Sequence, residues 1–162
     1  MKVQDLVIIR HFTAPRKSLW RAWTEPEQQS RWWGPQGFTT PVSKLDLRVG
    51  GGYLNCMRSP DGDEFCNTGI YREIVPFERI VCSDCFADHE GNVVPASYYG
   101  LEEDFPLELE VTVSFKEEDG GTKMTLREVG LPPEIIEDCR AGWNDAFDKL
   151  IKVLAGRKPE LH

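Results

Sequence analysis

The sequence predicts an α+β fold in which a curved antiparallel sheet wraps around a long C-terminal helix. Three observations lead to this prediction. Several short runs rich in β-branched and aromatic residues follow one another, with turn signals between them. Residues 107–115 alternate strictly between apolar and polar side chains, which is typical of a strand with one buried face. Residues 134–154 carry apolar side chains every three or four positions, the spacing of one face of a helix.

The first strand is expected over residues 6–13, because this run is rich in β-branched and aromatic side chains and stops before Pro15. Pro15 is suited to a first helical turn. Leu19, Trp20 and Trp23 then share one face at helical spacing. The sequence therefore predicts a short helix directly after the first strand.

A second short helix is predicted from residues 24–27, which have the form of a capping box. The Thr24 hydroxyl would accept from the amide of Glu27, whose carboxylate would reach back to the amide of Thr24. Gly34 and the proline after it end this helix, because proline cannot continue the hydrogen-bond ladder. We therefore expect Trp32 and Trp33 near its C-terminal end.

The middle of the chain reads as a series of antiparallel strands joined by turns. Strands are expected within residues 38–47, 53–57, 65–74, 79–86, 107–115 and 122–129. In the last two, Leu107, Leu109 and Val111 begin one inward-facing row, and Met124 and Leu126 continue the other. Residues 87–106 form a loop of unusual length, of the kind that often makes a lid or a binding loop. We expect this segment to contribute to specificity.

Length and composition favour one cytoplasmic domain over residues 1–162. A core of this size buries roughly 70% of the surface of the unfolded chain, so it needs no disulfide or metal. The 27 acidic residues outnumber the 19 Lys and Arg, and the net charge of −8 disfavours nucleic acid and anionic membranes as partners. The N-terminal apolar run, residues 6–9, is too short for an export signal or a membrane anchor. The odd number of cysteines, five, suits free thiols in a reducing compartment.

A pocket is expected between the sheet and the C-terminal helix. One helix cannot fill a strongly bent sheet along its whole length, because the two surfaces approach each other only locally. An apolar gap of this kind binds a small hydrophobic molecule or lipid, which is the function we expect. The candidate ligand-binding residues are aromatic: Trp32, Trp33, Tyr53, Tyr71, Tyr98, Tyr99, Phe105, Trp143 and Phe147. Packing against the sheet is an equal alternative for Trp32 and Trp33, and core packing is the first expectation for Trp143 and Phe147.

Cys82 and Cys85 with His89 suggest a zinc site, since two thiolates and an imidazole could supply three zinc ligands. Residues three apart on a strand point to opposite faces, and the sequence has no second Cys-x-x-Cys or His pair. We therefore expect no metal site, and no motif indicates a cofactor.

Catalysis has weak support in the sequence. The possible acids are Asp84, Glu73 and residues 102–104, and the possible bases are His11 and His89. No triad, paired-carboxylate or metalloprotease signature is present. We expect binding without catalysis, and the status of the protein as an enzyme stays open.

An ordered set of short motifs resembles one known family. These motifs include Arg31-Trp32-Trp33-Gly34-Pro35, Asp46 with Arg48-Val49-Gly50-Gly51, Asp61-Gly62, Gly69, Tyr71, Pro76-Phe77-Glu78-Arg79, Gly120-Gly121-Thr122 and Gly142-Trp143. The sequence resembles the heat-shock protein 90 ATPase activator homologue-like domains of the START-like, or polyketide cyclase-like (SRPBCC), superfamily. The resemblance implies the helix-grip fold.

The resemblance leaves several functions open. The superfamily includes lipid carriers, hormone receptors, cyclases and co-chaperone domains, so a shared fold does not choose among them. A chaperone partner and a role in stress response are the second hypothesis, although the co-chaperone carries an additional N-terminal domain that this sequence does not contain. Cyclase-like chemistry is the third hypothesis. The oligomeric state is expected to be a monomer or a homodimer.

Overall fold

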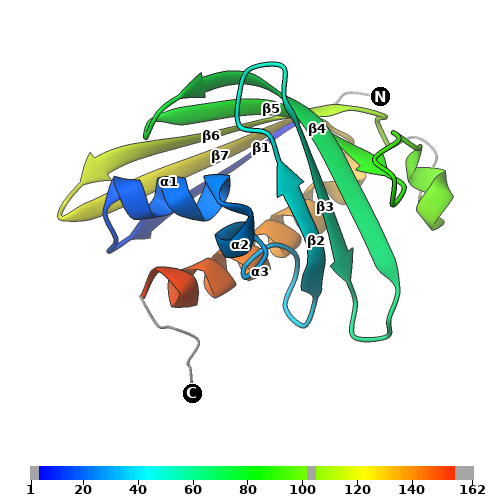
Figure 1. The fold of residues 1–162 in the computed structure, drawn as a ribbon, viewed down its shortest axis with the longest axis horizontal. Helices are drawn as coiled ribbons and strands as arrows, with labels where there is room; N and C mark the ends of the chain where they lie inside the picture. The colour runs from blue at the N-terminus through cyan, green and yellow to red at the C-terminus, as the bar shows by residue number, and fades with distance from the viewer. Residues whose placement is uncertain (1–3, 102–104, 156–162) are drawn as a thin grey trace.

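A curved antiparallel sheet surrounds a long helix in the computed structural model, which describes residues 4–101 and 105–155. The seven strands of the sheet follow the order β1-β7-β6-β5-β4-β3-β2, and all neighbours are antiparallel. The sheet arches over α3, while α1 lies across one end and contacts both α3 and β6 (Figure 1). The predicted helix-grip fold is confirmed.

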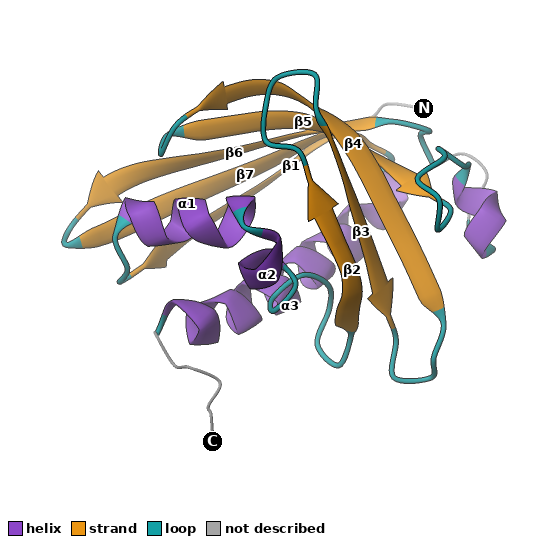
Figure 2. Ribbon diagram, in the orientation of Figure 1, coloured by secondary structure: helices purple, strands orange, loops and turns teal. Residues whose placement is uncertain are grey.

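The elements follow the predicted order closely (Figure 2). The strands are β1 Gln4–Phe12, β2 Thr39–Leu45, β3 Gly52–Arg58, β4 Glu64–Val75, β5 Arg79–Ala87, β6 Leu109–Glu118 and β7 Gly121–Leu131. The α-helices are α1 Arg16–Thr24, α2 Pro26–Gln29 and α3 Ile136–Leu154, and the 3-10 helices are η1 Ala96–Tyr99 and η2 Pro133–Ile135. Among the described residues, no helix is both long and apolar enough to cross a bilayer.

The start of α2 differs from the predicted capping box. The Thr24 hydroxyl donates to the Trp20 carbonyl at 2.7 Å, and Glu25 holds the N-cap position without a side-chain hydrogen bond. The prediction is wrong because Thr24 still belongs to α1, where its hydroxyl bonds to the preceding turn. Since α2 ends at Gln29, Trp32 and Trp33 follow the helix in a turn instead of lying within it.

The inward row of β6 begins later than the alternation predicts. Leu107 is 57% exposed and precedes the strand, whereas Leu109, Val111 and Val113 are buried. The alternating residues before Leu109 lie outside the sheet, where the chain bends at Leu107, so the pattern alone overextends the strand. Met124 on β7 is fully buried, as predicted.

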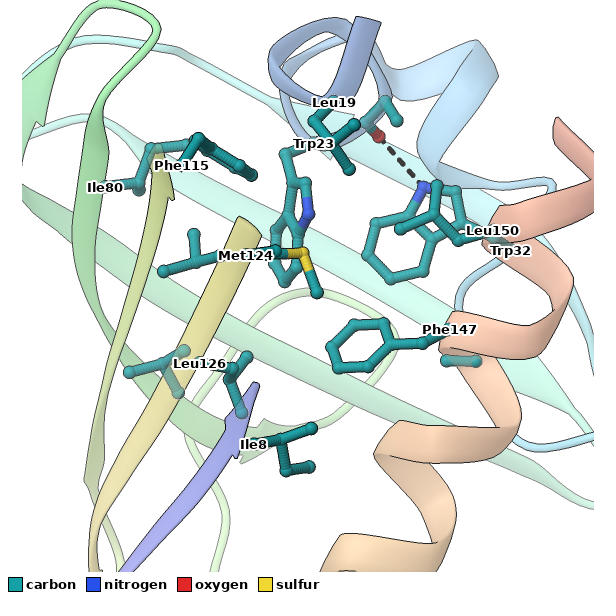
Figure 3. Close-up of a cluster of buried hydrophobic side chains, with 14 of the residues drawn as sticks. Ile8, Leu19, Trp23, Trp32, Ile80, Phe115, Met124, Leu126, Phe147 and Leu150 are labelled. Atoms are coloured by element: carbon teal, nitrogen blue, oxygen red, sulfur yellow. Dashed lines mark hydrogen bonds between the residues drawn. The ribbon is translucent and has the colours of Figure 1, made fainter. Parts of the chain in front are cut away.

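The centre of the core is an aromatic cluster between α1, α3 and the sheet (Figure 3). The Trp23 and Trp32 rings meet edge to face with centroids 4.8 Å apart, and the Phe147 ring lies 6.1 Å from Trp32. The Trp32 indole N–H donates to the Ala22 carbonyl at 3.0 Å, so burying this ring leaves no orphaned donor. This end of the space between sheet and helix is filled by side chains.

A disulfide joins Cys56 on β3 to Cys66 on β4, which face each other in the strand register. The prediction of five free thiols is therefore wrong for this pair, while Cys82, Cys85 and Cys139 are free. The parity of the cysteine count could not find the pair, because an odd total does not exclude one bridge. The facing positions follow only from the register of the β3–β4 hairpin.

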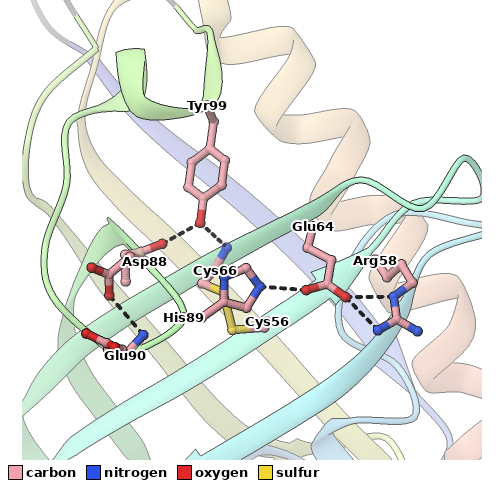
Figure 4. A network of polar contacts seen from close by, with 9 residues as sticks. Cys56, Arg58, Glu64, Cys66, Asp88, His89, Glu90 and Tyr99 are labelled. Carbon is pink, nitrogen blue, oxygen red and sulfur yellow. Dashed lines mark hydrogen bonds and ion pairs between the residues drawn. A yellow bond between two sulfur atoms is a disulfide. The ribbon is translucent and has the colours of Figure 1, made fainter.

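The long segment after β5 is held against the sheet by Tyr99 (Figure 4). Its hydroxyl donates to the Ala87 carbonyl at 2.5 Å and accepts from the Cys66 amide at 3.1 Å, so it bridges facing residues of β5 and β4. Nearby, Glu64 binds both Arg58 and His89 at the surface. Hydrogen bonds to the His89 and Arg58 side chains lower the pKa of Glu64.

Candidate ligand-binding cavity

A cavity of about 230 Å³ lies between α3, the turn after α2 and the sheet, beyond the aromatic end of the core. Its walls are mainly aromatic, aliphatic and sulfur-bearing. The lining residues are Trp33, Gly34, Pro35, Met57, Asn67, Asp84, Cys85, Phe86, Phe105, Pro106, Leu109, Glu128, Cys139, Gly142, Trp143 and Ala146. The incomplete filling expected of a bent sheet and one helix is present at this end.

Two pairs of aromatic rings form part of the wall. The Trp33 and Trp143 rings meet edge to face at 5.6 Å, and Phe86 and Phe105 meet at 5.3 Å. Trp143 also stacks on Phe147, one turn further along α3, at 5.6 Å. Because Phe147 belongs to the solid core, it fixes the position of the Trp143 ring at the cavity.

The turn that carries Trp33 is fastened to α3 by Lys149. The Lys149 ammonium donates to the backbone carbonyls of Trp33, Pro35 and Phe38 at 3.2, 3.1 and 3.3 Å. The three donors of one ammonium thus reach three carbonyls of the turn, of which that of Pro35 also accepts from the Phe38 amide and that of Trp33 from the Thr40 hydroxyl. Burial lowers the pKa of Lys149. This contact holds one wall of the cavity in place.

Glu128 brings a carboxyl group into the cavity from β7. It is 4% exposed and follows Met124 and Leu126 in the inward row of the strand. Its Oε1 accepts the indole N–H of Trp143 at 3.0 Å. Burial, with a smaller contribution from the Asp84 charge, raises the pKa of Glu128 to about 8. This carboxyl therefore keeps its proton to a higher pH than an exposed glutamate does.

Asp84 supplies a second carboxyl group from β5. The Tyr53 hydroxyl lies 3.0 Å from its Oδ1 and 2.9 Å from the Ser83 carbonyl, within donating distance of both. Gly69 faces Tyr53 across the β3–β4 ladder, and a Cβ at this glycine would lie 2.6 Å from the Tyr53 ring. The absence of that side chain lets the ring reach Asp84. Burial raises the pKa of Asp84 to about 6, despite the opposing hydrogen bond from Tyr53.

A smaller cavity of about 30 Å³ adjoins the first and shares Trp33, Asp84 and Trp143 with it. A space of this size is enough for one water molecule. Trp23 and Asn55 also line it, and Trp23 Nε1 and Asn55 Oδ1 are buried without a partner among the described residues. The polar interior thus continues from Asp84 toward the core.

A protein-family model matches most of the chain that forms this fold and this cavity. The model of the family described as "Activator of Hsp90 ATPase homolog 1-like protein" matches residues 13–155. The chain belongs to this family. Comparison with curated protein sequences finds no match.

Several solved structures resemble this member of the Hsp90 ATPase activator homolog 1-like family over nearly the whole length of both chains. Protein CV1439 from Chromobacterium violaceum is 26% identical at a TM-score of 0.77, covering 93% of this chain and 96% of that chain. A protein from Rhizobium leguminosarum is 29% identical at a TM-score of 0.72, covering 95% of each chain. The AHSA1 (SPO3351) protein from Silicibacter pomeroyi, 21% identical at a TM-score of 0.75 over 94% and 98% of the two chains, shares the fold.

The nine aromatic residues predicted to bind a ligand lie in four different parts of the structure. Trp33, Phe105 and Trp143 line the larger cavity. Tyr53 and Tyr71 line the smaller one. Trp32 and Phe147 are fully buried in the core. Tyr99 lies on η1 against Phe65 and Phe86, and Tyr98 beside it is 56% exposed. A ligand-binding role stays a prediction for all nine.

The candidate acids and bases also lie in different places, one at the cavity and others at the surface. Asp84 faces the cavity, whereas Glu73 pairs with Arg79 at the surface. His11 contacts the Glu118 carbonyl on an exposed face, and His89 pairs with Glu64. Residues 102–104 lie outside the described part of the chain. Within the described ranges, no group of three His, Cys, Asp or Glu side chains is arranged to hold a metal ion.

Several wall residues, among them Met57, Phe86 and Glu128, are not among the predicted ligand-binding residues, and Glu128 is the one that brings a carboxyl group. The alternation that places Met124 and Leu126 inward also places Glu128 inward, two residues later. A carboxyl group in an inward row is unusual, because a buried charge needs a partner or a proton. The sequence therefore does carry a signal for Glu128, namely a carboxyl group at a position where the strand pattern predicts a buried apolar side chain.

Proposed function

We propose that this protein binds a small, largely apolar molecule in the cavity between the sheet and α3. The observation that supports this proposal is the cavity itself, which remains open beside a core that is solidly packed at its other end. Protein interiors normally fill such space, because each unfilled volume forfeits packing contacts. A ligand would recover those contacts and remove apolar wall from water.

The volume limits the size of the ligand. An engineered cavity of roughly 150 Å³ binds benzene, and pockets for drug-sized ligands begin near roughly 300 Å³. The cavity of about 230 Å³ lies between these values. A molecule of one or two rings suits it better than a lipid with two long chains.

Gly142 offers a direct test, because it lines the cavity from α3 and a Cβ built on it meets no atom within 4 Å. Gly142→Phe is expected to fill the space and weaken binding of benzyl alcohol at least about tenfold, from a Kd of roughly 1 mM in the unmodified protein. Binding is measured by two-dimensional NMR, with the indole N–H signal of Trp143 as the local reporter.

Gly142→Ala is the matched control. It is expected to retain benzyl alcohol binding and to stabilise α3 by about 0.5–1 kcal/mol, because glycine is a poor helix former. Urea denaturation of both variants shows whether each is folded. Unchanged binding in a folded Gly142→Phe variant, or no binding to the unmodified protein, contradicts the proposal.

A chaperone-binding role is the second candidate, supported by the name of the matching family, Activator of Hsp90 ATPase homolog 1-like protein. If this protein acts in that way, adding it to purified Hsp90 raises the ATPase rate of the chaperone in a saturable manner. Gly142→Phe serves as the control that separates the two roles, since it changes a residue of the cavity wall. A rate that does not respond to the protein contradicts this candidate. Such a partner would require the cytoplasmic location that the composition favours.

A further inference from the structure

We infer that the cavity selects a small organic cation, an amine or ammonium group attached to an apolar body of one or two rings. This inference rests on the proposed function and names the class of ligand. It depends on three features of the cavity: two inward-facing carboxyl groups, the absence of a cationic side chain beside them, and aromatic walls.

The carboxyl groups of Asp84 and Glu128 have no cationic partner in the described part of the chain. No Lys, Arg or His of that part lines the cavity. The hydrogen bonds to these carboxyls come from uncharged donors, the Tyr53 hydroxyl and the Trp143 indole N–H. A buried carboxylate without a counter-charge is costly, so a cation that entered would relieve that cost.

The cations on the surrounding elements are already engaged elsewhere. Arg72 on β4 pairs with Glu108 at 2.7 Å. Arg140 on α3 donates to the Val7 carbonyl at 3.1 Å, and Lys149 donates to three carbonyls of the turn after α2. Among the residues that the structure describes, none of these cations is left to compensate the two carboxyls, and a cationic ligand would supply that charge.

The other titratable groups around the pair are uncharged near neutral pH. Burial raises the pKa of each of the following: Tyr53, Tyr71, Cys82, Cys85 and Cys139. Burial raises the pKa of both carboxyls, and that of Glu128 further than that of Asp84, so Asp84 is the first of the two to ionise as the pH rises. With Asp84 alone ionised, the cavity carries one negative charge, which one monovalent cation neutralises.

The walls are suited to the rest of such a ligand. The indoles of Trp33 and Trp143 and the rings of Phe86 and Phe105 surround the space. Indole faces attract cations more strongly than other aromatic side chains, and the gain increases when the cation is desolvated. The same rings pack against an apolar body.

Three one-ring probes of nearly equal size test the inference: benzylamine, which is a cation at pH 7.5, benzyl alcohol, which is neutral, and benzoate, which is an anion. Binding to the full chain is followed by calorimetry and by the Trp143 indole N–H signal. Benzylamine is expected to bind at least about tenfold more tightly than benzyl alcohol, and benzoate is expected to bind more weakly than both. At pH 5 the advantage of benzylamine is expected to shrink, because Asp84 takes up a proton.

Asp84→Asn is expected to remove most of the preference for benzylamine while benzyl alcohol still binds, because the amide keeps the shape of the side chain and loses its charge. Glu134→Gln, at an exposed site on η2, is the control and is expected to leave the preference unchanged. A preference that survives in folded Asp84→Asn and Glu128→Gln variants overturns the inference.

The outcomes separate this inference from the proposed function. Equal binding of benzylamine and benzyl alcohol at pH 7.5 overturns the cation preference and supports an apolar binding cavity. If none of the three probes binds, the proposed function is overturned together with the inference. Tighter binding of benzylamine that requires Asp84 supports both.

Discussion

Phe147→Ala is expected to lower the free energy of unfolding by about 3–5 kcal/mol, the usual cost of removing a fully buried aromatic ring. Phe147 is 0% exposed and lies within 6.3 Å, ring centre to ring centre, of Trp23, Trp32 and Trp143. These rings come from α1, α3 and the turn between α2 and β2, so no single element can move to close the gap. Equilibrium denaturation in urea measures the change.

Ile151→Ala, one turn further along α3, is the matched control for this substitution. Its side chain is 48% exposed, so its loss is expected to cost less than about 1 kcal/mol. A loss below 1 kcal/mol for Phe147→Ala would mean that the aromatic cluster is not the centre of the core.

Glu128→Gln is expected to stabilise the protein at alkaline pH, by on the order of 5 kcal/mol at pH 9. The Gln carbonyl oxygen can still accept the Trp143 indole N–H, and the amide never has to ionise inside the protein. The unmodified protein, by contrast, holds a buried carboxyl whose pKa is raised to about 8. The gain from the substitution is expected to be small at pH 4.

The direction of this pH dependence follows from the protons bound in each state. Between the unfolded pKa of Glu, near 4.3, and the folded pKa of about 8, the folded state holds a proton that the unfolded state has released. The stability of the unmodified protein therefore falls as the pH rises through this window, and it levels off above it. Asp84 adds a fall in the same direction, from its unfolded pKa up to about 6.

Urea denaturation at several pH values between 4 and 9 tests the expectation. Glu134→Gln is again the exposed control and is expected to show no comparable gain at pH 9. If Glu128→Gln destabilises the protein equally at every pH, the residue acts as a packed hydrogen-bond partner, and a raised pKa does not explain its effect.

The order of strands and helices was predictable because each element has a local signal. Alternation identified β6 and β7, and the three-to-four spacing identified α3. The boundaries that failed, at α2 and at the start of β6, depend on hydrogen bonds that local patterns do not encode. Thr24 is compatible with a cap or with the end of a helix, and the Trp20 carbonyl decides between them.

The site was only partly predictable, because it depends on residues far apart in the sequence. Glu128 and Trp143 come from β7 and α3, and their hydrogen bond exists only once the helix crosses the sheet. Tyr53 was noted as an aromatic residue, but its link to Asp84 depends on the β3–β4 register and on the space above Gly69. Residue type indicated candidates, and tertiary structure selected among them.

The bond between Cys56 and Cys66 bears on how the cavity accommodates different occupants. The next residues along the two strands, Met57 and Asn67, belong to the cavity wall. A slip of one residue between paired strands would turn their side chains to the opposite face of the sheet. The disulfide prevents such a slip, so it keeps the β3–β4 register of this wall fixed with or without a bound ligand. Adjustment to ligands of different shape is thereby left to the rest of the wall, where only non-covalent contacts hold the side chains.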